Sequence, residues 1–203
     1  GEVTVEATGS QTQVGTSKNT ITVTAVEGGN YDARNYRITP NEGDLVVTAS
    51  EKAIVIKANS NSWTYDGAEH SDGGFTITYD NVEVPRNGDG KYVLPTGDEI
   101  TVTVSGSVKN VWETEAGNNV VESYTVEHAE NYNSIQALPG KLEITPKEVT
   151  LTSQGDTKPY DGSALTKPGV SGTDGFVKGE VTVEATGSQT QVGTSKNTIT
   201  VTA

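Results

Sequence analysis

Residues 1–25 read GEVTVEATGSQTQVGTSKNTITVTA, and residues 179–203 repeat these letters without a change. Apolar residues occupy every second position in EVTVEA (2–7) and again in TITVTA (20–25). Alternation with a period of two, carried by β-branched residues, is typical of a half-buried β-strand. The stretch therefore predicts two strands joined by a polar connection, and the chain contains it twice.

The same alternation recurs elsewhere, broken about every eight to twelve residues by Gly, Asn, Asp or Pro. The further strand-like segments are KAIVIKA (52–58), EITVTVSG (99–106), KLEIT (141–145) and EVTLTS (148–153). A helical turn fits only within residues 112–132, and Gly117-Asn118-Asn119 interrupts that segment. The sequence predicts an all-β protein built from small antiparallel modules, either sandwiches or β-grasp-like layers.

The composition limits the partners. The chain carries 27 acidic and 14 basic side chains, a net charge of −13, which repels phosphate backbones and anionic lipids. With no run of about eighteen apolar residues, we expect neither nucleic acid nor membrane contact by this segment. Cysteine is absent, which excludes disulfides and thiolate metal sites. Methionine is absent too, so we expect a fragment internal to a longer protein, suited to an oxidising exterior.

A weaker repeat lies inside the 178-residue offset between the two identical stretches. The tripeptide Tyr-Asp-Gly occurs twice, each time a few residues after a strand-like run. DEITVTVSG (98–106) corresponds to the first nine residues of the chain, and NYNSIQALPGKLEIT (131–145) corresponds to NYRITPNEGDLVVT (35–48). These matches define one module in two diverged versions, A and B, that alternate.

The order of the matches divides the chain into three parts. Residues 49–146 form a complete module B, residues 1–48 are the C-terminal part of a split module A, and residues 147–203 are the truncated N-terminal part of the next module A. We expect residues 147–178 of one unit to complete residues 1–48 of the next. The links between modules are short, which favours a head-to-tail rod over a flexible chain.

These motifs resemble a known family. The paired Tyr-Asp-Gly motifs, the Asn-Tyr segments followed by Gly-x-Leu-x-hydrophobic-Thr, and the Gly- and Thr-rich β pattern resemble the YDG and MBG-type (mostly-β, glycine-rich) tandem repeats of bacterial cell-surface adhesins. The resemblance covers nearly the whole chain. It implies an extracellular protein on the bacterial cell surface whose repeats act as a stalk.

The Tyr-Asp-Gly motif also has a physical interpretation of its own. Asp and Gly accept the left-handed backbone that a tight turn requires. A preceding tyrosine can place its ring on the core and its hydroxyl at the rim. We therefore interpret the motif as a structural turn, present as Tyr65-Asp66-Gly67 and Tyr160-Asp161-Gly162.

Candidate chemistry is sparse. The only histidines are His70 and His128, in different polar settings, so neither a catalytic triad nor a zinc site is predicted. Residues 86–92, RNGDGKY, resemble a calcium loop, but Pro85 and Thr96 stand where acidic ligands are needed, which indicates a hairpin tip instead. We expect that the chain is not an enzyme and binds no cofactor. The sequence leaves open weak calcium binding by the many acidic side chains at the surface.

Two sharper hypotheses remain. An intramolecular amide crosslink would need a lysine, Lys57 or Lys147, beside Asn131 on a neighbouring strand. The tryptophans Trp63 and Trp112, both in module B, are candidate ligand contacts, although packing in the core is the simpler interpretation.

Two functions follow from these observations. The first is a structural repeat unit of an extracellular bacterial surface protein, a stalk or filament segment whose partners are neighbouring copies of the same repeat. The alternative is an adhesive role for module B, which would recognise a host or wall glycan or a host protein.

Overall fold

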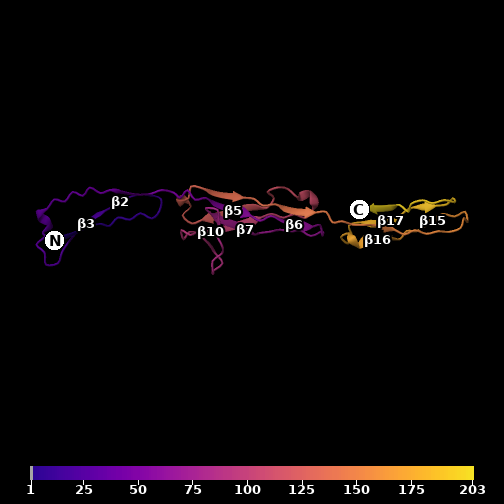
Figure 1. Ribbon diagram of the computed structural model, residues 1–203, viewed down its shortest axis with the longest axis horizontal. Helices are drawn as coiled ribbons and strands as arrows, with labels where there is room; N and C mark the ends of the chain where they lie inside the picture. The colour runs from indigo at the N-terminus through magenta and orange to yellow at the C-terminus, as the bar shows by residue number, and fades with distance from the viewer. Residues whose placement is uncertain (1) are drawn as a thin grey trace. The chain divides into compact units, whose positions relative to one another are not determined.

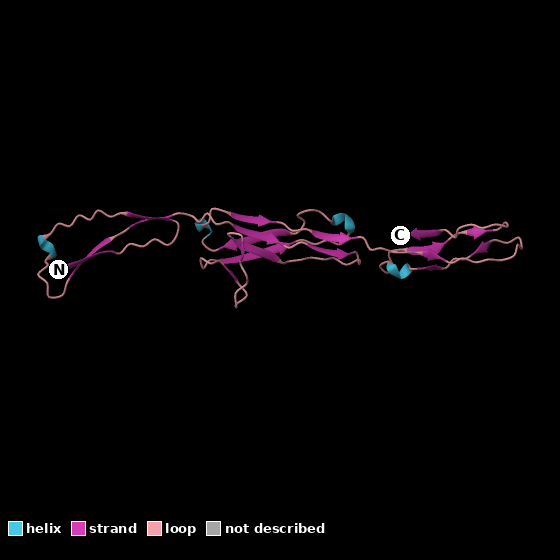
Figure 2. Ribbon diagram, in the orientation of Figure 1, coloured by secondary structure: helices cyan, strands magenta, loops and turns pink. Residues whose placement is uncertain are grey.

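The computed structural model describes residues 2–203, and the prediction of an all-β protein is confirmed. Strands account for 40% of the chain and helical turns for 6%, with no helix of seven or more described residues (Figure 2). None of the helices in this described part has the length and apolarity that a membrane span requires.

The chain divides into two compact units, which are described separately. Unit 1 comprises Gly1–Asn59, Gly73–Val104 and Val120–Pro139. Unit 2 comprises Ser60–Asp72, Ser105–Asn119 and Gly140–Ala203. Each unit thus takes part of the predicted module B.

The strands that lie wholly or mainly in unit 1 are β1 (Val3–Ala7), β2 (Gly15–Lys18), β3 (Ile21–Ala25), β4 (Asp44–Val47), β5 (Ile54–Ala58), β7 (Phe75–Tyr79), β8 (Val82–Glu83), β9 (Tyr92–Val93), β10 (Glu99–Ser105), β11 (Val120–Val126) and β12 (Ile135–Leu138). The strands of unit 2 are β6 (Asn61–Thr64), β13 (Leu142–Thr145), β14 (Thr152–Ser153), β15 (Leu165–Thr166), β16 (Val170–Ser171), β17 (Thr182–Ala185), β18 (Ser188–Gln189) and β19 (Ile199–Thr202).

Four single helical turns complete the secondary structure of the described residues. They are η1 (Ala33–Asn35), η2 (Val111–Glu113), η3 (Ala129–Asn131) and η4 (Thr173–Gly175). Of these, η2 and η3 fall on the segment where the sequence allows a helical turn. The other two were not predicted, since a turn of three residues is too short to show a helical period.

The core of unit 1 lies between a four-stranded sheet, β12-β5-β7-β8, and a three-stranded sheet, β11-β10-β9. Alternate residues of β5 point inward, and Ile54 and Ile56 are completely buried, as the period of two predicts. The rings of Tyr79 and Tyr132 meet edge to face, 6.2 Å apart. The buried side chains are Ile54, Ile56, Ile77, Tyr79, Val84, Leu94, Ile100, Val126 and Tyr132.

Two strand pairings differ from the expected antiparallel arrangement. In unit 1, β12 pairs with β5 in parallel, and in unit 2, β13 pairs with β6 in parallel. The prediction was wrong for these pairs because alternation fixes which face of a strand is buried but not the direction of its neighbour. Parallel partners also need a long connection between them, which is a feature of the whole module and not of either strand.

A small second core in unit 2 forms around β13. Leu142 and Ile144 from β13 are almost completely buried together with Val108. Trp63 and Tyr65 pack against them from β6 and the residue that follows it. This cluster therefore fixes the first Tyr-Asp-Gly motif to the module interior.

The two identical stretches fold into the same hairpin. We call residues 1–25 the first repeat and residues 179–203 the second repeat. In unit 1, β1 pairs with β3, with Val5 opposite Val23, and in unit 2, β17 pairs with β19, with Val183 opposite Val201. Figure 1 labels β3 of the first repeat and β17 of the second. The registers are the same, residue for residue, so the hairpin is determined locally by the repeated sequence.

Candidate functional site

A groove with a volume of about 600 Å³ lies in unit 2. One wall is formed by residues 153–160, which end at the first residue of the second Tyr-Asp-Gly motif, and the other by residues 187–197, which belong to the second repeat. Leu165 and Lys167 complete the lining. Tyr160 and Val192 lie on it and are largely exposed, with 63% and 87% of their surface accessible. We call this feature the C-terminal groove.

The walls of the C-terminal groove are joined at one end by Asn197. Its side-chain nitrogen donates to the carbonyl oxygens of Gln154 at 2.9 Å and Lys167 at 2.7 Å. The backbone carbonyl oxygen of Asn197 accepts from the Ser153 hydroxyl at 2.8 Å. Asn197 thus ties the second repeat to the segment before it. Each of these bonds satisfies a backbone carbonyl group that is not hydrogen-bonded within the short strands.

The first repeat has different neighbours. Its strand β2 pairs with β4, and Lys18 forms an ion pair with Asp44 at 2.5 Å. The corresponding residues of the second repeat, 193–196, form no strand and have no strand partner within residues 2–203. Conversely, Ser188 and Gln189 of the second repeat pair with β15, whereas residues 10–11 of the first repeat are outside any strand.

Burial follows the same division. Ala185 is buried in the second repeat, while the equivalent Ala7 is exposed in the first. Val14 of the first repeat is 36% exposed, and its N–H donates to Asn131 at 2.9 Å, whereas the equivalent Val192 is 87% exposed. Each repeat therefore leaves uncovered an edge that its twin has covered.

Both Tyr-Asp-Gly motifs adopt one local geometry. Gly67 and Gly162 both have φ +80, in the left-handed region. Asp66 accepts the N–H of residue 68 at 2.8 Å, and Asp161 accepts the N–H of Ser163 at 2.9 Å. The hydrogen bond from the Lys158 ammonium group has the largest effect on the pKa of Asp161 and holds it far below its usual range. The hydrogen bonds from the Ser163 N–H and hydroxyl lower this pKa further. The aspartates are thus engaged in closing the turns.

The two motif tyrosines differ in their surroundings. Tyr65 packs on Leu142 and Ile144, and its hydroxyl donates to Glu180, a bond that raises the pKa of Tyr65. Tyr160 lies on the C-terminal groove with no such cluster beneath it. The motif is the same in both modules, but only one of its tyrosines has an apolar surface to cover.

The two tryptophans are also unlike each other. Trp63 is half-buried, packs against the small core of unit 2, and stacks on His70 with ring centroids 4.9 Å apart. Trp112, in η2, is 79% exposed. Only Trp112 is placed for contact with a ligand.

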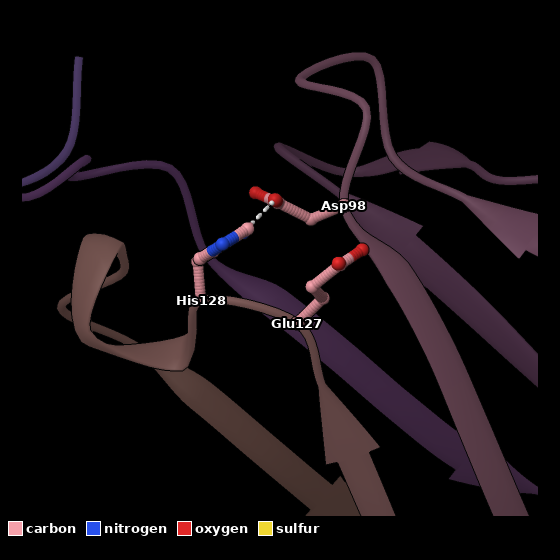
Figure 3. Close-up of side chains that lie close together, drawn as sticks. All are labelled: Asp98, Glu127 and His128. Carbon is pink, nitrogen blue, oxygen red and sulfur yellow. Dashed lines mark hydrogen bonds and ion pairs between the residues drawn. The ribbon is translucent and has the colours of Figure 1, made fainter.

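A group that the sequence analysis missed lies in unit 1, where Asp98, Glu127 and His128 come together (Figure 3). Their nearest oxygen and nitrogen atoms all lie within 4.8 Å of one another. Asp98 directly precedes β10, and the other two directly follow β11, so the pairing of these strands brings them to one end of the sheet. The separation of about thirty residues gave no motif from which this group could be recognised.

Hydrogen bonds already occupy both carboxylate oxygens of Asp98 and the Nδ1 atom of His128. His128 Nδ1 lies 2.8 Å from one oxygen of Asp98, and the other oxygen accepts from Thr96 and Tyr132. Burial alone would raise the pKa of Asp98, but these bonds outweigh it and lower that pKa. The Asp98 bond raises the pKa of His128, which favours the protonated ring and opposes metal ligation. The group fits an internal ion pair better than a metal centre.

The remaining candidates have structural surroundings. Asn87 caps its own hairpin tip, since its side-chain oxygen accepts the N–H groups of Asp89 and Lys91 at 3.0 Å and 2.9 Å. The side chain of Asn131, the proposed crosslink partner, accepts the Val14 N–H and donates to Gln13. Asn87 is thus engaged within the segment that the sequence indicates as a hairpin tip. Asn131 is hydrogen-bonded to residues 13 and 14.

No family model, curated protein or solved structure matches this chain. The function therefore has to be inferred from the repeats, the groove and the exposed side chains.

Proposed function

We propose that the chain is a structural repeat unit of an extracellular bacterial surface protein, a segment of a stalk or filament with a period of 178 residues. Its small β modules would be joined head to tail into a rod. Neighbouring copies of the same repeat would be its partners. The Tyr-Asp-Gly resemblance supports the bacterial cell surface as its location.

The observation that carries this proposal is the behaviour of the two repeats. Residues 1–25 and 179–203 are identical in sequence and pair in the same register, yet they are covered on different edges. A segment that recurs with a fixed offset and adopts the same hairpin is the mark of a periodic protein, in which each unit contacts mainly its neighbours.

The test is to measure size against repeat number. Arrays of one, two and four 178-residue periods would be compared by small-angle X-ray scattering. A rod gains the same length with every period, so its maximum dimension rises linearly. A compact assembly grows only as about the 0.38 power of residue number. Growth of that second kind would contradict the proposal.

The exposed Trp112 supports an alternative, an adhesive role for residues 49–146. An aromatic side chain that is 79% exposed beside polar loops can stack on a sugar ring or anchor a host protein. A glycan array probed with the full chain tests this idea. Adhesion would be favoured by specific binding that is lost in Trp112→Ala and kept when the exposed Val82 is changed to Ala. An array on which no glycan is bound would favour the stalk.

A further inference from the structure

We infer that the first Tyr-Asp-Gly motif is a joint between module B and the module that follows it. The motif binds residues 177–180, and this contact restricts the motion of residues 147–203 about the link between the modules. All the residues that form the joint lie in unit 2. The inference rests on the proposed function, which assigns residues 147–203 to the next module, and it adds the surface that joins them.

The parallel pairing of β6 with β13 places the motif at the exit from module B. The two strands are paired up to their last residues, with Thr64 opposite Thr145. Because parallel strands run in the same direction, the segments that follow them leave the ladder at the same end. The motif follows β6, and the link to residues 147–203 follows β13. The N–H of Tyr65 donates to the carbonyl oxygen of Thr145 at 2.9 Å, so the motif begins beside the link.

Tyr65 reaches from one module to the other. Its ring packs against Leu142 and Ile144 in the small core of unit 2. Its hydroxyl donates to the carboxylate of Glu180, which belongs to the second repeat. A tyrosine suits this position because it combines an apolar ring with a polar group at its far end. The core of module B thus holds a hydrogen-bond donor against the next module.

Gly67 allows the two segments to approach closely. A Cβ at this position would lie 2.9 Å and 3.4 Å from the two methyl groups of Val177, and 3.7 Å from a carboxylate oxygen of Glu180. Val177 is half-buried. The glycine is therefore required for a second reason besides its left-handed φ, because a side chain at this position would displace Val177.

Asp66 orders the turn between these two contacts. Its carboxylate accepts the N–H of Ala68 at 2.8 Å and lies 3.0 Å from Nε2 of His70. The ring of His70 stacks on Trp63, which packs against the same small core. Because these contacts already order the turn, little conformational entropy is lost when it binds residues 177–180.

The partner segment is itself a turn. The N–H of Glu180 donates to the carbonyl oxygen of Val177 at 3.3 Å, and Gly179 between them has φ +89. The turn brings both side chains to the motif, Val177 against Gly67 and Glu180 against Tyr65. The joint thus combines a close steric fit with a directional hydrogen bond.

The link between the modules contacts the same region. A Cβ at Gly175, in η4, would lie 2.9 Å from a methyl group of Val149, which belongs to the link. Residues 173–180 are therefore contacted by the link at one point and by the motif at another. A covalent connection alone leaves two modules free to move relative to each other, whereas a second contact away from it restricts that motion.

The absence of cysteine allows the contact to be measured by disulfide formation. Gly67→Cys and Val177→Cys are introduced into one chain, because the close approach at Gly67 brings the two Cβ atoms within disulfide range. The folded protein is equilibrated with a glutathione redox buffer, the free thiols are alkylated, and the disulfide is quantified by mass spectrometry. The result gives the effective concentration of one cysteine at the other.

The matched control moves the first cysteine to the second motif, as Gly162→Cys with Val177→Cys. Gly162 and Gly67 share φ +80, so both substitutions introduce the same backbone strain. Position 162 is closer to position 177 in the sequence, so a loosely connected chain would favour the control pair. We expect an effective concentration at least about tenfold higher for positions 67 and 177. Equal values, or a higher value for the control pair, would overturn the inference.

Variants of the hydrogen bond test the part played by Tyr65. In the chain with cysteines at positions 67 and 177, Glu180→Ala should lower the effective concentration at least about threefold, because a hydrogen bond to a charged group is lost. Tyr65→Phe should have the same effect, and the combined variant should have no larger one, since each change removes the same bond. Glu2→Ala is the matched control, because Glu2 is the equivalent of Glu180 in the first repeat. An equal loss in Glu2→Ala and Glu180→Ala would overturn the part assigned to this bond.

Spin labels measure the restriction of motion while Gly67 is kept. Labels are attached through Ser62→Cys on β6 and Thr200→Cys on β19, both at exposed positions, and pulsed electron paramagnetic resonance gives the distribution of distances between them. We expect Glu180→Ala to widen this distribution at least about twofold, because relative motion is the default for modules without a firm interface. Glu2→Ala should leave it unchanged. An equal width with and without Glu180 would show that the link alone holds the modules and would overturn the joint.

The two proposals can fail separately, because the joint is measured in one chain and the stalk in arrays. Linear growth of the arrays with equal effective concentrations for the two cysteine pairs would leave the stalk proposal standing and remove the joint. A higher effective concentration at positions 67 and 177, in arrays that grow as compact assemblies, would retain the contact and contradict the stalk.

Discussion

The side-chain nitrogen of Asn197 donates to the carbonyl oxygen of Lys167 at 2.7 Å and so ties the second repeat to the segment that precedes it. Asn197→Ala removes this bond and the one to Gln154, so we expect it to destabilise the surrounding segment by about 1–3 kcal/mol. Hydrogen exchange of peptides from residues 147–178, which are unique in sequence, should become faster. Asn19→Ala is the matched control, because it removes the same side chain from the same local sequence. An equal effect of both variants on these peptides would contradict the role of Asn197.

The core of unit 1 predicts a large and local stability effect. Ile56 is completely buried between the two sheets, so Ile56→Ala should lower the free energy of unfolding by about 2–5 kcal/mol. Val82, on β8 at the edge of the same sheet, is 69% exposed, and Val82→Ala should change the free energy of unfolding by less than about 0.5 kcal/mol. Urea unfolding followed by circular dichroism measures both, and similar midpoints for the two variants would be inconsistent with this core.

The His128 and Asp98 pair predicts a pH dependence. The pKa of His128 is raised above its ordinary 6.5 in the folded chain, so its stabilisation is present below that pH and is lost as the pH rises through the folded value. The pKa of Asp98 is lowered from 3.8, so its contribution is present above that pH and is lost on acidification. The pair therefore stabilises unit 1 most between these two values.

Urea unfolding at about pH 5.5 and about pH 8.5 tests this expectation. His128→Gln should reduce the loss of stability between the two conditions, because the amide cannot be protonated. Glu127 and Glu130 also raise the pKa of His128, so a Glu130→Gln variant should weaken the dependence without abolishing it. An unchanged pH profile in His128→Gln would argue against the ion pair.

The two tryptophans should differ in their contribution to stability, because one is packed and the other is exposed. Trp63→Ala removes a ring that stacks on His70 and packs against the small core of unit 2, so we expect a loss of about 2–4 kcal/mol. Trp112→Ala removes a side chain that is 79% exposed and should change stability by less than about 0.5 kcal/mol. Thermal unfolding compares the variants, and a large loss in Trp112→Ala would mean that this ring is packed in solution.

The turn glycines offer a comparison within one motif. Gly67 and Gly162 share φ +80, so an alanine at either position should cost about 1–2 kcal/mol through backbone strain alone. A Cβ at Gly67 would also lie 2.9 Å from a methyl group of Val177, whereas a Cβ at Gly162 meets nothing within 4 Å. We expect Gly67→Ala to be the more destabilising variant in urea unfolding, and the reverse order would contradict the described packing.

Much of the fold could be predicted because its strands alternate. The period of two located β1, β3, β5, β10 and β13 and identified the buried face of β5. Residues 148–151 were expected to extend the strand that ends at Ser153, but only β14 forms there. Strand length depends on a partner, and β14 pairs for two residues only, with β16.

The candidate sites were harder to predict, because they depend on contacts between distant segments. The Tyr-Asp-Gly turns follow from local backbone preferences, and the sequence located them. The C-terminal groove, the Asn197 bonds and the His128 pair involve residues about ten to forty-five positions apart, with no spacing that marks them. The identity of the two repeats was the most informative feature of the sequence. The structure adds that the same residues have different neighbours in the two copies.

The parallel pairing of β5 with β12, and of β13 with β6, has a mechanical consequence. The partner strands of each pair come from opposite ends of residues 49–146, and they run in the same direction. A pull on the two ends of that segment would load each ladder in shear, because the force would act along the strands while the hydrogen bonds cross between them. All the bonds of a ladder would then have to fail together, whereas a hairpin pulled from its open end loses them one at a time. The pairing that the alternation did not predict is thus the one suited to bearing tension.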